Sequence, residues 1–403
     1  MKKKFIIDVG LNIVSAAFPL FVLQLIALPL VASKFGSEQY GIVIALISAL
    51  TLISFPMGNV LNNTRLLKNE KYKDNEINGD FNILLLVGGG LSFIAIVIVT
   101  HFIDPSPSFV TYLLLSVMAI LTLLKDYLVV GFRLELKYKS ILISNIYLGL
   151  GYFIGTVLFA LTNIWQLIYL SGLVLNTIFL LKNLSLHKEP ILKTKFMKDT
   201  FSTAAMLYVS SLMKNITIHA DKLLLLPFLG PTSVAVYYSS TILGKTISMV
   251  VSPLNSVILS YLVKKNTIKI TDILKIIIGI TITGSVGYFI TIGVSPYFFS
   301  IFYSNWAEES LRIVFITTGA IVIQMMSSVI QPFNLRFNEP KWQVYINGLY
   351  LLIYLPTTIS LVKGYGLLGF SWGVLAVAIF GLILQVSVLM INIKSAHASK
   401  NVN

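Results

Sequence analysis

The sequence has no cysteine and very little charge. Charged residues make up 11% of its 403 residues and apolar residues 56%, whereas a soluble domain carries about 25% charge. A globule of this size could not cover its surface with so few charges, which argues against a soluble enzyme, a disordered protein and a nucleic-acid-binding protein. The formal net charge of +14 therefore needs another explanation, and the composition predicts an integral membrane protein.

Several kinds of chemistry are missing as well. Without cysteine there are no disulfides, thiolate nucleophiles, zinc–thiolate sites or iron–sulfur sites. The four histidines are scattered along the chain, which argues against a histidine-rich metal site. No Gly-x-x-x-x-Gly-Lys-Ser/Thr loop occurs, so a nucleotide-driven pump is disfavoured. We expect no metal, no ATP and no nucleic acid as cofactor or partner.

Long apolar runs recur along the whole chain. A helical span needs about 20 apolar residues, and strand-period alternation is absent, so we expect an all-α polytopic protein. The first run is too long for a signal peptide and is predicted to be retained. The twelve predicted spans are 8–32, 39–63, 81–103, 109–131, 141–161, 164–182, 203–229, 232–262, 272–295, 311–333, 343–362 and 367–392.

Basic residues alternate between the two sets of loops. With the N-terminus inside, the inner segments hold twenty-three lysines and arginines, and the outer segments hold only Lys34, Arg312 and Lys363. Inner loops of membrane proteins carry such an excess. The pattern predicts both termini on the cytoplasmic side of the cytoplasmic (inner) membrane, and it accounts for the net positive charge.

The chain divides into two halves that resemble each other weakly. The polar stretch 183–202 separates six spans from six, which predicts lobes at 1–190 and 191–403. The outer turn at Gly36 has a counterpart at Gly230, and Pro56 has one in Pro253. Two six-span repeats that enter the membrane in the same direction predict a cavity at their interface. The alternative is that glycine and proline turns are simply common between helices joined by short loops.

Ordered motifs carry a resemblance to a known superfamily. Span 7 continues from His219 through Asp221-Lys222 and an apolar run to Leu229-Gly230-Pro231, then to Val234-Ala235-x-Tyr237. Gly36-Ser-Glu-Gln-Tyr-Gly41 follows span 1, Asn62-Asn63-Thr-Arg65 ends span 2, and Leu335–Pro340 and Gly366–Gly369 occur in the second half. In this order they resemble the polysaccharide-exporting branch of the MOP (multidrug/oligosaccharidyl-lipid/polysaccharide) exporter superfamily, typified by the Wzx-type flippases.

The resemblance implies a MATE-like carrier of two lobes, with spans 1, 2, 7 and 8 lining a central cationic cavity. It implies movement of an undecaprenyl-diphosphate-linked oligosaccharide to the outer leaflet, for O-antigen (lipopolysaccharide), capsule or another surface polysaccharide. Alternating access would drive this without ATP hydrolysis. The expected partners are the lipid-linked oligosaccharide, membrane lipids, and a polymerase or ligase of the same pathway.

Charges inside the predicted spans are candidates for function, because a membrane charge is costly. Lysines suit a lipid diphosphate, since each offers a point charge and three donors. We therefore expect Lys214, Lys222 and Lys245 to bind phosphate and Arg65 to receive the headgroup first. Asp221 and His219 are candidates for Na⁺ or H⁺ coupling, although Asp221 could instead hold a lysine and His219 could simply pack. We expect Asp221 and Lys222 to find partners on other spans. For Lys125 and Asp126 we expect a structural pair or a lysine that snorkels to the membrane surface.

Uncharged polar side chains gather in spans 1, 2, 7 and 8. Amides and hydroxyls suit sugar hydroxyls, yet each one alone could serve as glue between helices. Their concentration in four spans favours a polar cavity. The candidates are Asn12, Asn59, Asn62, Asn215, Tyr237 and Asn255.

Two other functions compete with the flippase. An ion-coupled multidrug exporter could share the architecture, but a cavity for cationic drugs should be acidic. A membrane glycosyltransferase, polymerase or ligase usually needs a sizeable outer domain, and the longest outer segment, 295–310, has some sixteen residues. We therefore expect a transporter and not an enzyme.

Overall fold

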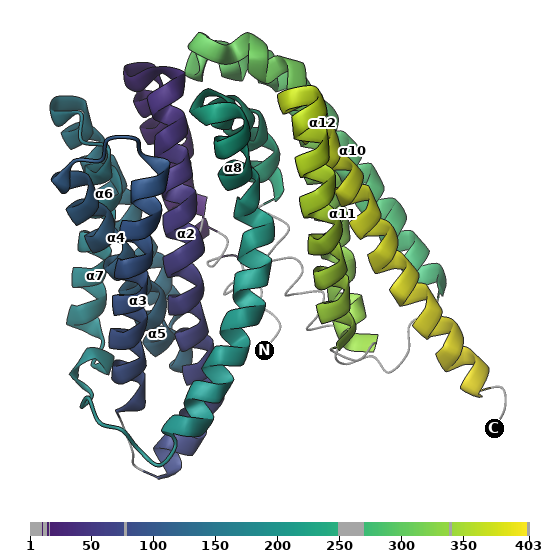
Figure 1. Cartoon of the computed structure of the whole chain (residues 1–403). Helices are drawn as coiled ribbons and strands as arrows, with labels where there is room; N and C mark the ends of the chain where they lie inside the picture. Colours follow the sequence, from purple (N-terminus) through teal and green to yellow (C-terminus); the bar gives the residue numbers. More distant parts are fainter. Residues whose placement is uncertain are drawn as a thin grey trace. The chain divides into compact units, whose positions relative to one another are not determined.

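The computed structural model describes residues 10, 14–15, 17–75, 79–248, 270–337 and 341–400, and these are helical almost throughout (Figure 1). The helices are the π-helix η1 (Leu23–Ala27), α2 (Leu28–Asp74), α3 (Asp80–Ile103), α4 (Phe109–Leu128), α5 (Val130–Leu134), α6 (Tyr138–Thr162), α7 (Gln166–Asn183), the 3-10 helix η2 (Leu186–Lys188), α8 (Met197–Ser248), α10 (Ile270–Phe302), the 3-10 helix η3 (Ser304–Trp306), α11 (Ala307–Phe337) and α12 (Lys341–Lys400).

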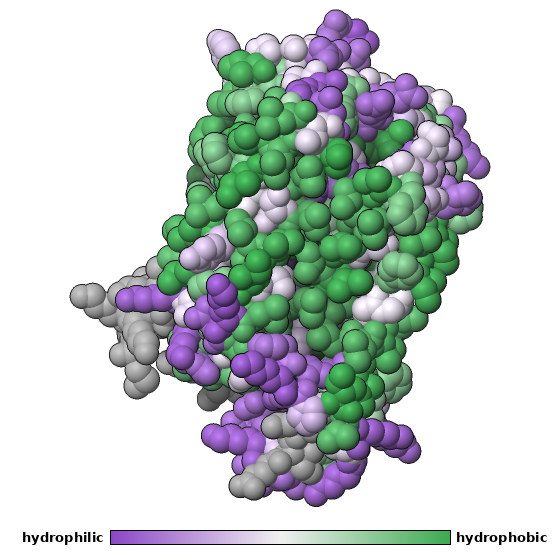
Figure 2. Space-filling model, turned by 90° about the vertical axis from the view of Figure 1, so that its left-hand side faces the viewer, coloured by the Kyte–Doolittle hydropathy of each residue, from purple (hydrophilic) through white to green (hydrophobic). Residues whose placement is uncertain are grey.

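The helices present apolar side chains to their surroundings. Within the described residues, eight helices are long and apolar enough to cross a membrane. Phe153, Val157 and Leu161 of α6 are exposed, and Figure 2 shows a broad hydrophobic band with hydrophilic groups at its two ends. An apolar surface of this extent is typical of contact with lipid. The protein is a multi-pass, all-α membrane protein, as predicted.

Three of the long helices contain a glycine at which the backbone leaves the helical conformation. The φ angles are 71° at Gly36, 77° at Gly230 and 59° at Gly366, a region that glycine enters without steric cost. The ψ angles at Gly36 and Gly230 are −179° and 176°. The two turns predicted to correspond therefore share one backbone conformation. Pro253, the predicted counterpart of Pro56, lies outside the described residues.

Contacts show that the chain turns back at Gly36. Before it, Ser15 donates a hydrogen bond to the carbonyl of Ile141, at the start of α6. Lys34 then donates to Oδ1 of Asn163, at the opposite end of α6. After the turn, Asn62 reaches Asp126 near the end of α4. The stretch 17–74 therefore forms two antiparallel spans, as predicted.

The same turn occurs at Gly366 in α12. A Cβ on Gly373 would lie 3.3 Å from Cα of Thr358, and one on Gly381 would lie 2.8 Å from the ring of Tyr350. The two halves of α12 thus pack against each other as a hairpin. The three glycine turns divide three of the eight apolar helices into two segments each, which gives eleven segments. Together with α7, the described residues contain twelve segments that match the predicted spans.

The chain forms two compact units, Met1–Leu226 and Pro227–Asn403. The predicted lobe boundary at residue 190 lies earlier, in the stretch before α8. The first part of α8 belongs to unit 1 because the beginning of this helix and the preceding linker are bonded to α2 and α3, as described below. Within unit 2, Trp306 donates to Ser239 at 2.9 Å, and Asn334 donates to the carbonyl of Gln385 at 3.0 Å.

Candidate functional site

Helix α2 continues eleven residues beyond the predicted end of span 2, to Asp74. No glycine or proline interrupts residues 59–74, and leucine, lysine and glutamate are good helix formers. The extension places Arg65 beside the linker 184–196, and Lys68 and Lys71 beside Asp199 at the start of α8. We call this part of unit 1, where α2, α4 and α7 end and α3, α6 and α8 begin, the basic end.

Arg65 is held at the basic end by a bidentate ion pair. Its Nη1 and Nη2 donate to the two carboxylate oxygens of Glu189 at 2.7 and 2.6 Å, and the guanidinium lies 4.7 Å from the centre of the Phe81 ring. The side chains of Arg65 and Glu189 are only 6% and 12% exposed. Glu189 therefore neutralises Arg65, whose proposed part in receiving the headgroup stays a prediction.

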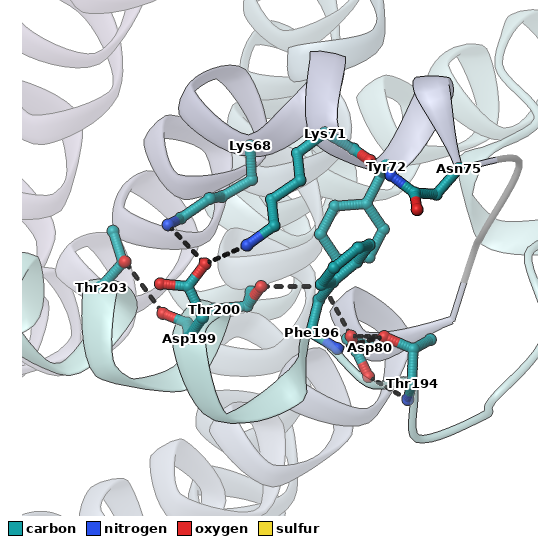
Figure 3. Close-up of polar contacts among 10 residues, drawn as sticks. All are labelled: Lys68, Lys71, Tyr72, Asn75, Asp80, Thr194, Phe196, Asp199, Thr200 and Thr203. Atoms are coloured by element: carbon teal, nitrogen blue, oxygen red, sulfur yellow. Dashed lines mark hydrogen bonds and ion pairs between the residues drawn. The ribbon is translucent and has the colours of Figure 1, made fainter.

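A second set of polar contacts joins the beginning of α8 to α2 and α3, and we call it the linker latch (Figure 3). Lys68 and Lys71 both donate to Asp199, at 2.9 and 2.8 Å. Tyr72 donates to Asp80 at 2.5 Å and lies 2.8 Å from the hydroxyl of Thr200. Asp80 also accepts bonds from the backbone and side chain of Thr194. These bonds explain why the first part of α8 belongs to unit 1.

Asp199 offers a test of the latch. Hydrogen bonds from Lys71 and Lys68 lower the pKa of its carboxyl to about 2. A lowered pKa means that the ion pairs contribute stability above the ordinary carboxyl pKa and lose it as the pH falls through about 2. Because Asp199 is exposed, Asp199→Asn should lower the melting temperature only slightly, and high salt should remove the difference. A large loss that persists in high salt would contradict this assignment. The measurement is thermal unfolding in detergent at low and high salt.

Three asparagines of α2 form a chain of amides toward α5. Asn62 donates to the carbonyl of Asp126 at 2.8 Å and accepts a bond from Nη1 of Arg133 at 2.6 Å. Asn63 accepts a second, longer bond from the same nitrogen at 3.3 Å and donates to Asn59 at 2.7 Å. Asn62 is buried, whereas Asn59, Asn63 and Arg133 are half-buried. Of the predicted sugar-binding residues, Asn59 and Asn62 therefore lie in one network.

Lys125 and Asp126 form the predicted structural pair, with Nζ and Oδ1 2.5 Å apart. Gly58 of α2 allows α4 to come close here, because a Cβ at this position would lie 2.8 Å from Cβ of Asp126. The other carboxylate oxygen of Asp126 is buried and has no hydrogen-bond partner within the described residues. This pair secures the contact between α2 and α4.

Asp221 and Lys222 of α8 bond to each other, a pairing that the sequence made less likely than partners on other spans. Nζ of Lys222 lies 2.7 Å from Oδ1 of Asp221, and the side chains are 4% and 10% exposed. Neighbouring residues point about 100° apart around a helix, but the four-carbon stem of lysine is long enough to bring the ammonium back.

The remaining candidate residues lie in α8 or outside the described residues. Asn215 is buried and donates to the carbonyl of Ser211 in its own helix at 2.8 Å. Tyr237 is buried against Phe370, with ring centres 5.3 Å apart. His219 and Lys245 are half-buried. Lys214 lies in α8, but its side chain is outside the described set, as are Asn12 and Asn255.

The acidic partners at the basic end are not apparent from the sequence. The three acids Glu189, Asp80 and Asp199 each bind residues more than a hundred positions away or across a loop. Arg133 was predicted only as one of the basic residues of an inner loop. One signal was present, because Glu189 and Asp199 are isolated acids in an otherwise basic linker. Their partners depend on the folding of α2 against the linker, which no spacing reveals.

Comparison with solved structures finds this arrangement of helices elsewhere. The lipid II flippase MurJ in an inward closed conformation has a TM-score of 0.66 and 15% identity, over 96% of this chain and 90% of that chain. An inward-facing MATE family multidrug resistance transporter of the MOP superfamily has a TM-score of 0.64 and 14% identity, over 95% and 99%.

The protein shares the fold of these two transporters. A mutant of the Vibrio cholerae MATE transporter VcmN is also similar, with a TM-score of 0.56 and 12% identity over 98% of this chain and 97% of that chain. No protein-family model matches the chain, and the search of curated proteins finds no match. At these identities the likeness concerns the fold, and the cargo must be argued from the residues.

Proposed function

We propose that the protein moves an undecaprenyl-diphosphate-linked oligosaccharide from the inner to the outer leaflet of the cytoplasmic membrane by alternating access. The product would serve a surface polysaccharide such as O-antigen or capsule. The observation that carries this proposal is the charge of α8, which holds Lys214, Lys222 and Lys245 against the single acid Asp221 between residues 203 and 248. An excess of lysine in membrane helices favours an anionic cargo.

The fold supports a transporter. MurJ, one of the similar structures, is named as a lipid II flippase. A lipid diphosphate cannot cross hydrocarbon without replacement of its hydration, and charged side chains within a membrane helix can supply that replacement. Coupling to Na⁺ or H⁺ through Asp221 or His219 is part of the same proposal.

A multidrug exporter is the second candidate, because the MATE family transporter reaches nearly the same TM-score as MurJ, 0.64 against 0.66. The fold therefore does not choose between the two cargo classes. The basic residues of α8 favour the flippase, since cationic drugs would be repelled by them.

The lysines provide the test. After depletion of the protein, lipid-linked glycans would be identified by mass spectrometry, and an impermeant sugar-modifying enzyme would report their leaflet. We expect completed units to remain on the cytoplasmic leaflet. Lys214→Gln and Lys245→Gln should each slow their export about tenfold, the value of a charge-assisted hydrogen bond.

Lys139→Gln is the matched control, because Lys139 is an exposed lysine at the start of α6, and it should export like the wild type. Unchanged lipid glycans together with raised sensitivity to cationic drugs would replace the flippase by the drug exporter. Unchanged export in both α8 variants would remove the lysine argument.

A further inference from the structure

Arg133 differs from three other cations of unit 1, Arg65, Lys125 and Lys222, each of which is paired with a carboxylate. Arg65 is paired with Glu189, Lys125 with Asp126 and Lys222 with Asp221. No carboxylate pairs with Arg133 within the part of the chain that the structure describes. Neutral amides of Asn62 and Asn63 hold it instead, so its positive charge is not compensated locally.

The amides fix the orientation of the guanidinium. Asn62 donates its Nδ2 to the carbonyl of Asp126, which leaves its Oδ1 to accept from Arg133, and Asn63 donates to Asn59 in the same way. Both oxygens meet a single nitrogen, Nη1. Among the described residues, nothing accepts a hydrogen bond from Nε or Nη2. The edge formed by these two nitrogens is the one that binds a phosphate in bidentate fashion.

This site is also accessible. Arg133, Asn59 and Asn63 are half-buried, whereas Asn62 behind them is buried. Asn59 and Asn63 lie four residues apart and hence on one face of α2. An anion at the Nε–Nη2 edge would meet an oriented guanidinium in surroundings poorer in water than the bulk, where charge-assisted hydrogen bonds are strengthened.

We propose that Arg133, oriented by Asn62 and Asn63, binds the diphosphate of the cargo at the basic end of unit 1. This inference rests on the proposed function and adds a binding residue to it. It separates the two arginines of this region, because Glu189 already neutralises Arg65 while Arg133 keeps its charge for the ligand.

The test uses the full-length protein in nanodiscs, with undecaprenyl diphosphate as the lipid probe and inorganic pyrophosphate as the soluble probe. Arg133→Gln should weaken binding about tenfold or more. The affinity of Arg133→Lys should lie between those of the wild type and Arg133→Gln, because an ammonium keeps the charge but loses the planar fork. Lys139→Gln removes an exposed charge six positions away and should bind like the wild type.

Asn63→Asp guards against misfolding as an explanation. It leaves Arg133 in place and sets a carboxylate beside it, which should preserve or raise the melting temperature while weakening binding as strongly as Arg133→Gln does. Wild-type affinity in both Asn63→Asp and Arg133→Gln would overturn the inference.

The outcomes for the two proposals differ. Lipid binding that depends on Arg133, in a protein that moves no lipid-linked glycan, would keep this inference and overturn the proposed function. Normal export together with normal binding in both Arg133→Gln and Asn63→Asp would overturn this inference and keep the proposed function. Arg133-dependent binding of the lipid probe alone assigns the site to a lipid headgroup, and binding of pyrophosphate alone assigns it to a soluble diphosphate.

Discussion

Glu189→Gln is expected to lower the free energy of unfolding by about 3–5 kcal/mol, the cost of leaving one member of a buried ion pair alone. The substitution nearly preserves the shape of the side chain and removes only its charge. Arg65, whose side chain is 6% exposed, would then keep a full charge with no counter-ion. The measurement is unfolding in mixed detergent micelles, followed by helix content.

Glu135→Gln is the matched control for this prediction. Glu135 also pairs with a cation, Lys137, but their side chains are 55% and 60% exposed. Exposed pairs contribute little, because water and salt screen them, so this variant should unfold like the wild type. If both glutamate variants were equally stable, the Arg65–Glu189 pair would not hold the linker.

A double replacement separates the cost of an unpaired charge from the cost of losing the geometry of the pair. Arg65→Leu together with Glu189→Leu removes both charges, and a buried ion pair can often be exchanged for apolar residues without loss. We expect this variant to recover most of the stability that Glu189→Gln loses. Failure to recover would indicate that the geometry of the pair, and not the balance of charge, stabilises the basic end.

Asp221→Asn is the second substitution with a large expected effect, again about 3–5 kcal/mol. Lys222 would remain in α8 with its side chain 4% exposed and its partner oxygen replaced by a neutral amide. Within a membrane helix an unpaired lysine is costly in its own right. The same unfolding experiment measures this loss.

Addition of Lys222→Met to Asp221→Asn distinguishes structure from transport. The double variant removes both charges of this pair and should regain the stability lost through the lone Lys222. If Lys222 also binds the cargo, as proposed, export of lipid-linked glycan should stay low in a protein that is again stable. Full export in the stable double variant would show that the pair is structural only and would leave Lys214 and Lys245 as the phosphate ligands of α8.

Local patterns predicted most of the fold correctly. The span 81–103 corresponds to α3, Asp80–Ile103, and 141–161 to α6, Tyr138–Thr162, because an apolar run of the right length and its polar ends are both visible in one stretch of sequence. The glycine turn at Gly36 was predicted for the same reason. The length of α2 was not, since its last turns are polar and their contacts lie far away in the chain.

The candidate site was predicted less completely. The sequence marks which residues carry charge inside spans. For Lys125 it left a pair with Asp126 or snorkelling open, and the structure shows the pair. It could not show that Lys222 folds back onto Asp221, which depends on how tightly α8 is buried. Nor could it distinguish Arg65 from Arg133, since one meets a carboxylate from the linker and the other meets two amides of α2.

The sequence by itself determined that this is an all-α membrane protein of twelve spans with an excess of basic residues, because apolar length and charge are properties of single segments. Only the tertiary structure decided which charges are neutralised. Counter-ions at the basic end come from the linker and α8, more than a hundred residues from their partners on α2, and the free energy of a buried charge depends on the atoms within a few ångströms of it. That distance is set by packing, and so the residues left to bind a diphosphate become visible only in the folded chain.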